Sequence, residues 1–403
     1  MLTVLRRLFL IAIFGLSGIA SVKAESSLSL YGTLDMGMSY QSATDSIDER
    51  FHGGSKFGLI SGGQSTNLIG LTGKEDIGSG IRLSFVLENS FNIGNGGPAF
   101  ADRIFARQSW IGADSSSLGY LRFGRQFNFA RDYLNPLTPF SGGDFARASA
   151  GINFATGGTE RLSNTLKFES ADLSGFKFGL GYSFSAQIPS AYISDGNNGD
   201  AGISIEPGKT TNYNFGQADN LRALTAGLKY QSGPVYLTMT SDTFYPNAAT
   251  ANDKYRAITS RSVGGYYDLG GTKIAAAYGQ TRNGWINGVQ PIVGFDQTIT
   301  FNTLNNSIIF DENVAINSYL LAFTATTSPD SSLFGAWRIV NPLSNMRQYA
   351  IAPINTQNSL SLGYTYNFTK RTNLYVYTTY TSNYATVEGV TSYAVGVGLR
   401  HKF

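Results

Sequence analysis

Charged side chains recur in this sequence at alternate positions within apolar segments, as Arg122 does between Leu121 and Phe123. Successive side chains of a β-strand point to opposite faces, so such a charge and its apolar neighbours lie on opposite sides of a sheet. Charges fixed on one polar face discriminate between ions and orient dipolar solutes. The residues that this alternation assigns to the polar face are Arg82, Glu88, Arg122, Arg161, Lys167 and Lys177. The same alternation assigns Leu162, Leu166 and Phe168 to the apolar face.

Residue types that carry catalysis or bind metals are scarce. The chain has two histidines, His52 and His401, and no cysteine. No Cys/His cluster has the spacing of metal ligands, and no nucleophile-elbow, zinc-protease or phosphate-loop motif occurs. A hydrolase would need a base beside its nucleophile, and His52 is the one plausible base. The sequence therefore predicts neither an enzyme nor a bound cofactor.

The elements that position these charges have a period of two and are therefore strands. Residues 81–88, 176–184 and 360–368 alternate apolar side chains with small or charged ones. So does the end of the chain at 392–403, S-Y-A-V-G-V-G-L-R-H-K-F, which stops on the aromatic Phe403. Each run is about ten residues long, enough for a tilted strand to cross a bilayer.

Connections of two kinds separate the strands. Short turns are predicted at 74–79, 113–118, 170–174, 231–233, 268–271, 327–330 and 369–371. Long polar loops are predicted at 41–63, 92–103, 127–160, 185–220, 244–259, 282–314, 341–356 and 383–390. Tight turns on one side and long loops on the other are typical of an outer-membrane barrel. The pattern predicts an all-β, antiparallel transmembrane barrel of 16 strands with short periplasmic turns and long extracellular loops.

An exported soluble β-sandwich or solenoid is the alternative to a barrel. Its strands would be shorter and would carry charge on their outer faces. Here charged residues make up only 14% of the chain and share faces with Gly, Ser and Thr, opposite the aromatic residues. Backbone groups in lipid must all be paired, and closure removes unpaired edges. We therefore expect the first strand, at 27–32, to pair with the last, at 392–403.

The first 24 residues have the features of a signal peptide. Arg6 and Arg7 precede an apolar run at 8–20, and Val22-Lys23-Ala24 is a small-residue cleavage signal. The chain has 30 basic and 27 acidic residues, so loss of Arg6, Arg7 and Lys23 leaves 27 of each. A neutral mature chain gives no argument for binding nucleic acid. The expected organisation is a signal peptide at 1–24 and one barrel domain at 25–403.

Several segments resemble the general porins of Gram-negative outer membranes, especially the beta-proteobacterial type. They include S-S-L-S-L-Y-G-T-L-D-M-G from residue 26, G-L-T-G-K-E-D-I-G-S-G-I-R-L-S-F-V-L-E at 70–88 and A-R-Q-S-W-I-G at 106–112. L-R-F-G-R-Q-F at 121–127, Y-N-F-T-K-R-T-N-L-Y at 366–375 and the terminal G-L-R-H-K-F complete the ordered set. The resemblance spans the mature chain. It implies a homotrimer of 16-stranded barrels that admits small hydrophilic solutes by diffusion.

The resemblance also implies a pore constriction. In the family the third long loop, here 127–160, folds into the barrel and brings acidic side chains, here Asp132 and Asp144, opposite a basic wall. Glu88 is expected on the same acidic side of the pore. Arg107 matches the family's pore arginine and joins that wall. Leu68 aligns with a position that is often basic in relatives. Strong anion selectivity therefore does not carry over, and we expect a weak anion preference.

The predicted partners follow from the barrel and from the resemblance. They are outer-membrane lipid and lipopolysaccharide, further copies of the chain, small solutes, and the barrel assembly machinery, for which Phe403 resembles the family's terminal signal. Two other functions stay open on the same fold. One is a substrate-selective channel, and the other is a non-channel adhesin or structural barrel that displays the loops at 185–220 and 282–314.

Overall fold

The computed structural model describes residues 26–44, 53–99, 103–139, 161–186, 221–246, 256–286, 308–343 and 355–403. Strands account for most of them. The first eight strands are β1 (Ser26–Ala43), β2 (Gly54–Ser61), β3 (Leu68–Gly78), β4 (Ile81–Ser90), β5 (Gln108–Ser115), β6 (Gly119–Phe127), β7 (Arg161–Ser170) and β8 (Phe176–Ser183). The next five are β9 (Arg222–Ser232), β10 (Val235–Tyr245), β11 (Ile258–Asp268), β12 (Thr272–Ile286) and β13 (Ile308–Ser328). The last four are β14 (Ser331–Pro342), β15 (Gln357–Asn367), β16 (Thr372–Ser382) and β17 (Thr391–Lys402).

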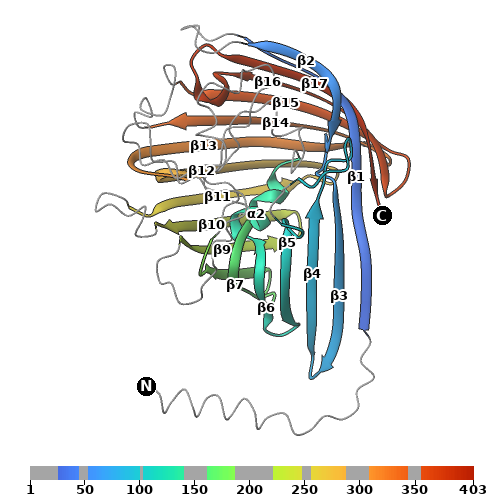
Figure 1. Cartoon of the computed structure of the whole chain (residues 1–403), viewed down its shortest axis with the longest axis vertical. Coiled ribbons are helices and arrows are strands. Elements are labelled where there is room, and N and C mark those ends of the chain that lie inside the picture. Colours follow the sequence, from blue (N-terminus) through green and yellow to red (C-terminus); the bar gives the residue numbers. More distant parts are fainter. Residues whose placement is uncertain are drawn as a thin grey trace.

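The strands form one antiparallel sheet that closes on itself (Figure 1). Closure joins β1 to β17 in the register Asp35 opposite Arg400. At the seam the amide of Gly32 donates to the carbonyl of Phe403 at 3.0 Å, and the Phe403 amide donates to the Gly32 carbonyl at 3.1 Å. The predicted closure of the first strand on the last is therefore confirmed, but the predicted segment at 27–32 is too low. Of those residues only Gly32 bonds to the last strand, and the ladder with β17 runs from Thr33 to Ala43.

The sheet has 17 strands but 16 positions around the wall. The lower part of β1 pairs with β3 and its upper part pairs with β2. β2 and β3 are thus two pieces of a single wall position, which confirms the prediction of a 16-stranded barrel. The loop predicted over 41–63 is correspondingly shorter, because it contains β2, whose ladder with β1 runs from Gly54 to Ser61.

Two other connections differ from the prediction because strand pairing continues into polar sequence. The first short turn is Ser79–Gly80, since Lys74, Glu75 and Asp76 remain in the β3–β4 ladder. The loop predicted over 282–314 is shorter, because β12 and β13 stay paired beyond a bulge at Arg282. Polar side chains on a lumen face do not end a strand, so composition placed these boundaries too early.

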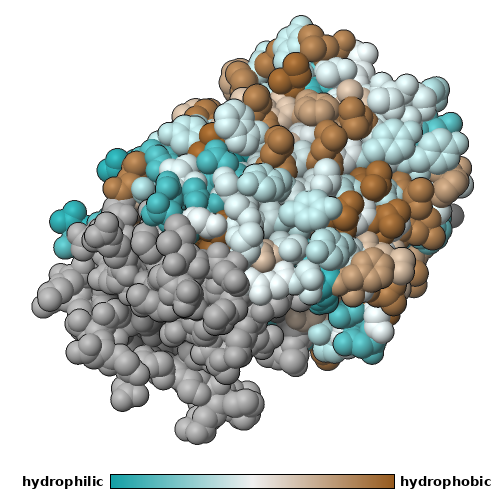
Figure 2. Space-filling view, turned by 90° about the horizontal axis from the view of Figure 1, so that it is seen from above, coloured by the Kyte–Doolittle hydropathy of each residue, from teal (hydrophilic) through white to brown (hydrophobic). Residues whose placement is uncertain are grey.

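The two faces of the wall differ as the alternation predicts. On β15, Leu360 and Leu362 are exposed on the outside, whereas Ser359 and Ser361 are buried on the inside. Figure 2 shows hydrophobic side chains spread over the part of the outer surface seen there. This is the arrangement of a barrel with lipid outside and a polar interior.

Candidate pore constriction

A short helix, α2 (Phe129–Leu134), follows β6 and turns into the barrel, with a 3-10 turn, η1 (Asn135–Leu137), after it (Figure 1). The helix packs on the inner faces of β8, β9 and β10, and η1 on those of β11 and β12. Helix and turn are the described start of the loop predicted at 127–160. The prediction that this loop folds into the barrel is confirmed for residues 128–139.

Glycines in the wall make room for the aromatic side chains of α2. A Cβ on Gly179 would lie 2.1 Å from Cζ of Phe129, and a Cβ on Gly227 would lie 2.6 Å from Cε2 of Tyr133. Both rings are fully buried against the wall. Since neither approach is open to a residue with a side chain, these two glycines determine how close α2 lies to the wall.

Polar contacts hold the start of the helix. The Asn128 Oδ1 caps α2 by accepting from the Arg131 amide at 2.9 Å. Its Nδ2 donates to the buried Asp242 carboxylate at 3.2 Å. The Phe129 amide donates to the Thr225 hydroxyl at 2.9 Å. Two of the amides left unpaired at a helix N-terminus are thereby satisfied, one of them by the barrel wall.

Lys167 on β7 lies beneath the helix rather than in the open lumen. Its Nζ forms an ion pair with Asp132 of α2 and donates to the Phe127 carbonyl at 2.9 Å. The ammonium also lies 4.4 Å from the centre of the Phe129 ring. The side chain is only 2% exposed. The structure therefore brings together two predicted site residues, Lys167 and Asp132, as an anchor for the loop.

A second contact between wall and helix centres on Glu169. Tyr133 of α2 donates its hydroxyl to the Glu169 carboxylate at 2.8 Å. Lys229 and Lys177 lie on the same carboxylate, at 3.4 Å and 4.0 Å. Sequence reasoning found Lys177 but not Glu169, Lys229 or Tyr133. The alternation of side chains could have found two of them. Glu169 lies on the same inward face of β7 as Lys167, and Lys229 lies on the same inward face of β9 as Thr225.

Arg107 and Glu88 form a buried ion pair between the start of β5 and the end of β4. The Arg107 amide donates to the Glu88 carbonyl at 3.1 Å, and Tyr31 of β1 donates its hydroxyl to the Glu88 carboxylate at 3.0 Å. The two residues were predicted to face each other from opposite sides of the pore. They are instead neighbours on one wall.

Arg122 lies between two aromatic rings on the inner face of β5 and β6. Its guanidinium carbon is 4.2 Å from the centre of the Trp110 ring and 3.8 Å from that of Tyr120. Asp114 accepts from its Nη2 at 3.4 Å. The predicted inward direction of Arg122 agrees with this position, since Leu121 and Phe123 are exposed on the other face.

Arg82 lies apart from this group. It is exposed and lies six residues below Glu88 on β4, toward the short turns. At the rise of a strand this separation is about 20 Å along β4. Asp144 lies outside the described residues.

The predicted outward position of Leu162 is wrong. Asn164 adopts a left-handed φ of 49°, and the β6–β7 register shifts at this point. A bulge of this kind reverses the alternation beyond it. Leu162 is consequently buried with Phe244 and Ile258. The same reversal takes the neighbouring Arg161 out of its predicted inward alternation with Lys167. Its guanidinium lies 5.1 Å from the centre of the Phe127 ring, where the third loop begins.

The model of the Gram-negative porin family matches residues 10–386. This chain is a Gram-negative porin. An outer membrane porin protein of Bordetella pertussis is 37% identical over 404 residues, which cover 96% of this chain and 97% of that protein. Outer membrane porin protein 32 of Delftia acidovorans is 24% identical over 375 residues, 91% of this chain and 87% of that protein. The predicted family, the outer-membrane location and the non-enzymatic nature of the protein are thereby confirmed.

Solved structures agree with the fold of this porin. The anion-selective porin from Comamonas acidovorans has a TM-score of 0.63 at 20% identity, with 94% of this chain and 100% of that chain covered. OmpF of Salmonella typhi has a TM-score of 0.59 at 16% identity, with 93% and 97% covered. Within the described ranges of the porin, no helix is long and apolar enough to cross a membrane. Nor do those ranges contain a group of three acidic, histidine or cysteine side chains placed to hold a metal ion.

Proposed function

We propose that this porin forms a water-filled channel for passive diffusion of small hydrophilic solutes and ions, with a weak preference for anions. The observation that carries the proposal is the third loop inside a closed 16-position barrel, beside a wall that carries Arg107, Arg122, Lys177 and Lys229. A barrel of this size is too wide for side chains to fill, so a loop inside it determines the width of the pore.

The balance of charge on this wall supports a weak preference. Glu88 is paired with Arg107, Asp114 with Arg122, and Asp132 with Lys167. The Glu169 carboxylate, by contrast, lies between two lysines, which leaves an excess of positive charge beside α2. Charges that line the narrowest part of a pore have the largest effect on ion selectivity.

Leu68 is a reason to expect the anion preference to be weak. It is the first residue of β3 and shares the inward alternation of Gly70 and Thr72, because Ile69 and Leu71 are exposed outside. An apolar side chain at this inward position adds no positive charge to the pore. The structurally similar porin from Comamonas acidovorans is described as anion-selective, and the present channel is expected to be less so.

Reversal potentials across a planar bilayer in a salt gradient test the proposal. The wild type should show a small excess of anion over cation permeability. Arg122→Ala and Arg107→Ala should each move the reversal potential toward cation selectivity. Arg161→Ala should move it less, because the bulge at Asn164 takes Arg161, the first residue of β7, out of the inward alternation. Clear cation selectivity of the wild type would contradict the anion preference, and absence of channel steps would contradict the proposed function itself.

We also propose that the channel assembles as a homotrimer. β2 pairs with β1, while β4 ends at Ser90, level with Leu68, so β2 extends above the next described wall strand. Phe57 and Leu59 on β2 are 68% and 64% exposed. A strand edge in lipid needs a partner, and a second copy of this chain supplies one. Sedimentation of the refolded protein in detergent tests this, and a monomer would contradict it.

A further inference from the structure

The second wall position of the barrel is interrupted in its middle. β2 ends at Ser61 opposite Met36, and β3 resumes at Leu68 opposite Thr33. Six residues on this side thus cover the space of two on β1, so most of them cannot remain in the wall. The segment Gly62–Asn67 is called the inner turn below.

The inner turn lies on the lumen side of the wall, bound to Asp35. One Asp35 oxygen accepts from the amides of Gln64 and Ser65 at 3.0 Å and 2.6 Å. The other accepts from the Tyr375 hydroxyl at 2.7 Å. Asp35 and Tyr375 are both fully buried on the inner face. A carboxylate that accepts two backbone amides forms strong, charge-assisted hydrogen bonds, so it fixes the turn against the wall.

The wall stays closed behind the inner turn because Asn67 takes the place of the missing strand. Its Oδ1 accepts from the Asp35 amide at 2.5 Å, and its Nδ2 donates to the Asp35 carbonyl at 2.9 Å. The Gly62 amide donates to the same carbonyl at 2.9 Å. A primary amide reproduces the donor and acceptor of a peptide group, so the β1 backbone remains paired at the interruption.

Side chains of β16 and β17 hold the tip of the inner turn. Asn373 donates to the Gln64 Oε1 at 2.8 Å, and Arg400 donates to the Ser65 hydroxyl at 2.9 Å. Arg400 also donates to the Asn373 Oδ1 at 2.9 Å, which links the two contacts. A Cβ on Gly63 would lie 2.0 Å from the Tyr375 oxygen, so the turn lies directly on that side chain.

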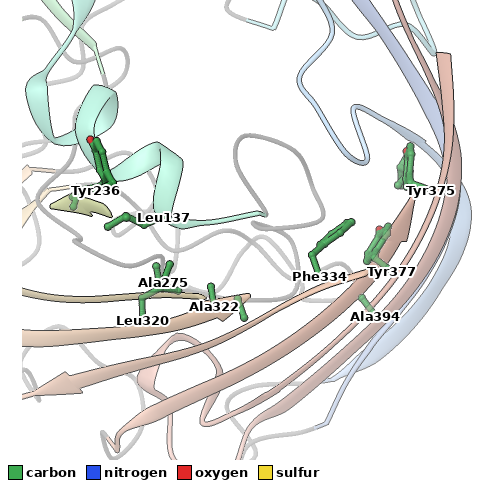
Figure 3. Close-up of a cluster of buried hydrophobic side chains, with 12 residues drawn as sticks. Leu137, Tyr236, Ala275, Leu320, Ala322, Phe334, Tyr375, Tyr377 and Ala394 are labelled. Carbon is green, nitrogen blue, oxygen red and sulfur yellow. The ribbon is translucent and has the colours of Figure 1, made fainter. Parts of the chain in front are cut away.

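The inner turn faces the third loop across the barrel. β1 and β10 lie half a circuit apart in the 16-position wall, and α2 packs on β8, β9 and β10. Followed through the ladders from β9 to β17, Gly227 comes level with the upper end of β1, near Ala43. Followed the other way, through β8 to β3, it comes level with the lower end, near Ser26. Because the strands tilt, the height of Gly227 lies midway between these ends, which is close to Asp35. Figure 3 shows Tyr375 on the wall across the interior from Leu137, which follows α2.

We propose that the inner turn is a second constriction element, which narrows the pore from the side opposite the third loop, and that Asp35 is its positioning residue. The partly exposed Gln64 and Ser65 present an amide and a hydroxyl to the lumen. A solute therefore passes between the charged wall beside the third loop and a turn whose own side chains are uncharged hydrogen-bonding groups. The inference rests on the proposed channel function and adds a specific element that determines its width.

Cysteine modification tests the position of the inner turn, because the chain contains no cysteine of its own. Gln64→Cys channels should react with a membrane-impermeant methanethiosulfonate reagent and lose conductance in discrete steps. A sulfonate reagent should shift selectivity toward cations, and an ammonium reagent toward anions. Ile69→Cys, exposed on the outer face of the same wall position, is the matched control and should keep its conductance. Failure of Gln64→Cys to react, or reaction without a change in current, would overturn the proposal.

Removal of the turn tests its effect on pore width. Deletion of residues 63–66 leaves two residues opposite two on β1, so the wall can close directly. Single-channel conductance and the size limit for solute entry into liposomes should both rise. Asp35→Asn should increase open-channel noise, whereas Tyr377→Phe, a buried tyrosine that binds Ser39 instead of the turn, should not. Unchanged conductance of the folded deletion variant would overturn the proposal. A wild type without channels would instead contradict the proposed function, and if the deletion or Asp35→Asn fails to fold, the cysteine result decides.

Discussion

Lys167 shows how a single charge can have a structural role in a pore. It was expected in the basic wall, and it does face inward, but its ammonium is occupied by Asp132, by the Phe127 carbonyl and by the Phe129 ring. Buried ions are stable only when paired and hydrogen-bonded, and this one meets both conditions. Lys167 therefore holds the loop, while Arg122 and the lysines around Glu169 are left to act on passing ions.

Lys167→Met should loosen the third loop. Removing one partner of a buried ion pair costs about 3 kcal/mol, the lower end of the usual range, because Asp132 is partly exposed. Open-channel noise should increase, and the folded form should melt at lower temperature in detergent. Lys177→Met is the control, since its ammonium is 4.0 Å from Glu169 and a third exposed. A quiet channel of wild-type stability in Lys167→Met would show that the pair does not hold the loop.

The helix α2 depends on the strands beneath it more than on its own sequence. Six residues are too few to form a stable helix alone. Its cap is bound to Asp242, its aromatic rings lie on Gly179 and Gly227, and Tyr236 donates its hydroxyl to the Tyr133 carbonyl at 2.8 Å. Contacts with the inner wall of the barrel therefore stabilise α2.

Gly179→Val should displace the helix without opening the barrel. The new Cβ would meet the Phe129 ring at 2.1 Å, whereas the strand backbone accepts valine readily. Overpacking of this kind costs about 1–3 kcal/mol. Conductance should change and its noise should rise, measured on single channels. Gly58→Val is the matched control, because a Cβ there meets nothing within 4 Å. Equal behaviour of the two variants would contradict the role of Gly179.

The whole molecule depends on one seam, where β1 meets β17. The seam runs from Thr33 opposite Lys402 to Ala43 opposite Ser392, and the Phe403 ring covers Gly32 beyond its lower end. An open sheet would expose the unpaired backbone groups of two strand edges to lipid. The barrel therefore has to close before it is stable in the membrane.

Deletion of Phe403 should reduce the yield of correctly assembled protein in the outer membrane. It removes two backbone hydrogen bonds with Gly32, each worth about 1 kcal/mol, and the ring above them. Heat-modifiable mobility on gels measures the folded fraction. Phe403→Tyr keeps both the backbone and the ring and should assemble normally. An unchanged folded yield after the deletion would contradict the prediction.

The sequence by itself determined the strands, their inward and outward faces, the closing pair and the order of turns and loops. These follow from alternation, which is local, and from the requirement that every backbone group in lipid be paired. The inward direction of Arg122 and Lys167 is one of the features that alternation predicts. The family resemblance added the third loop inside the barrel.

Tertiary structure alone decided the partners. Whether Lys167 meets Asp132, whether Glu169 lies between two lysines, and whether Asp35 binds the turn beside it depend on register between residues far apart in the chain. A pattern with a period of two also cannot indicate where a bulge interrupts it, as Asn164 does before Leu162. The same limit hid the inner turn, because six polar residues between two strands have the composition of any loop. The buried carboxylate of Asp35, with Asn373 and Arg400, holds them on the lumen side of the wall.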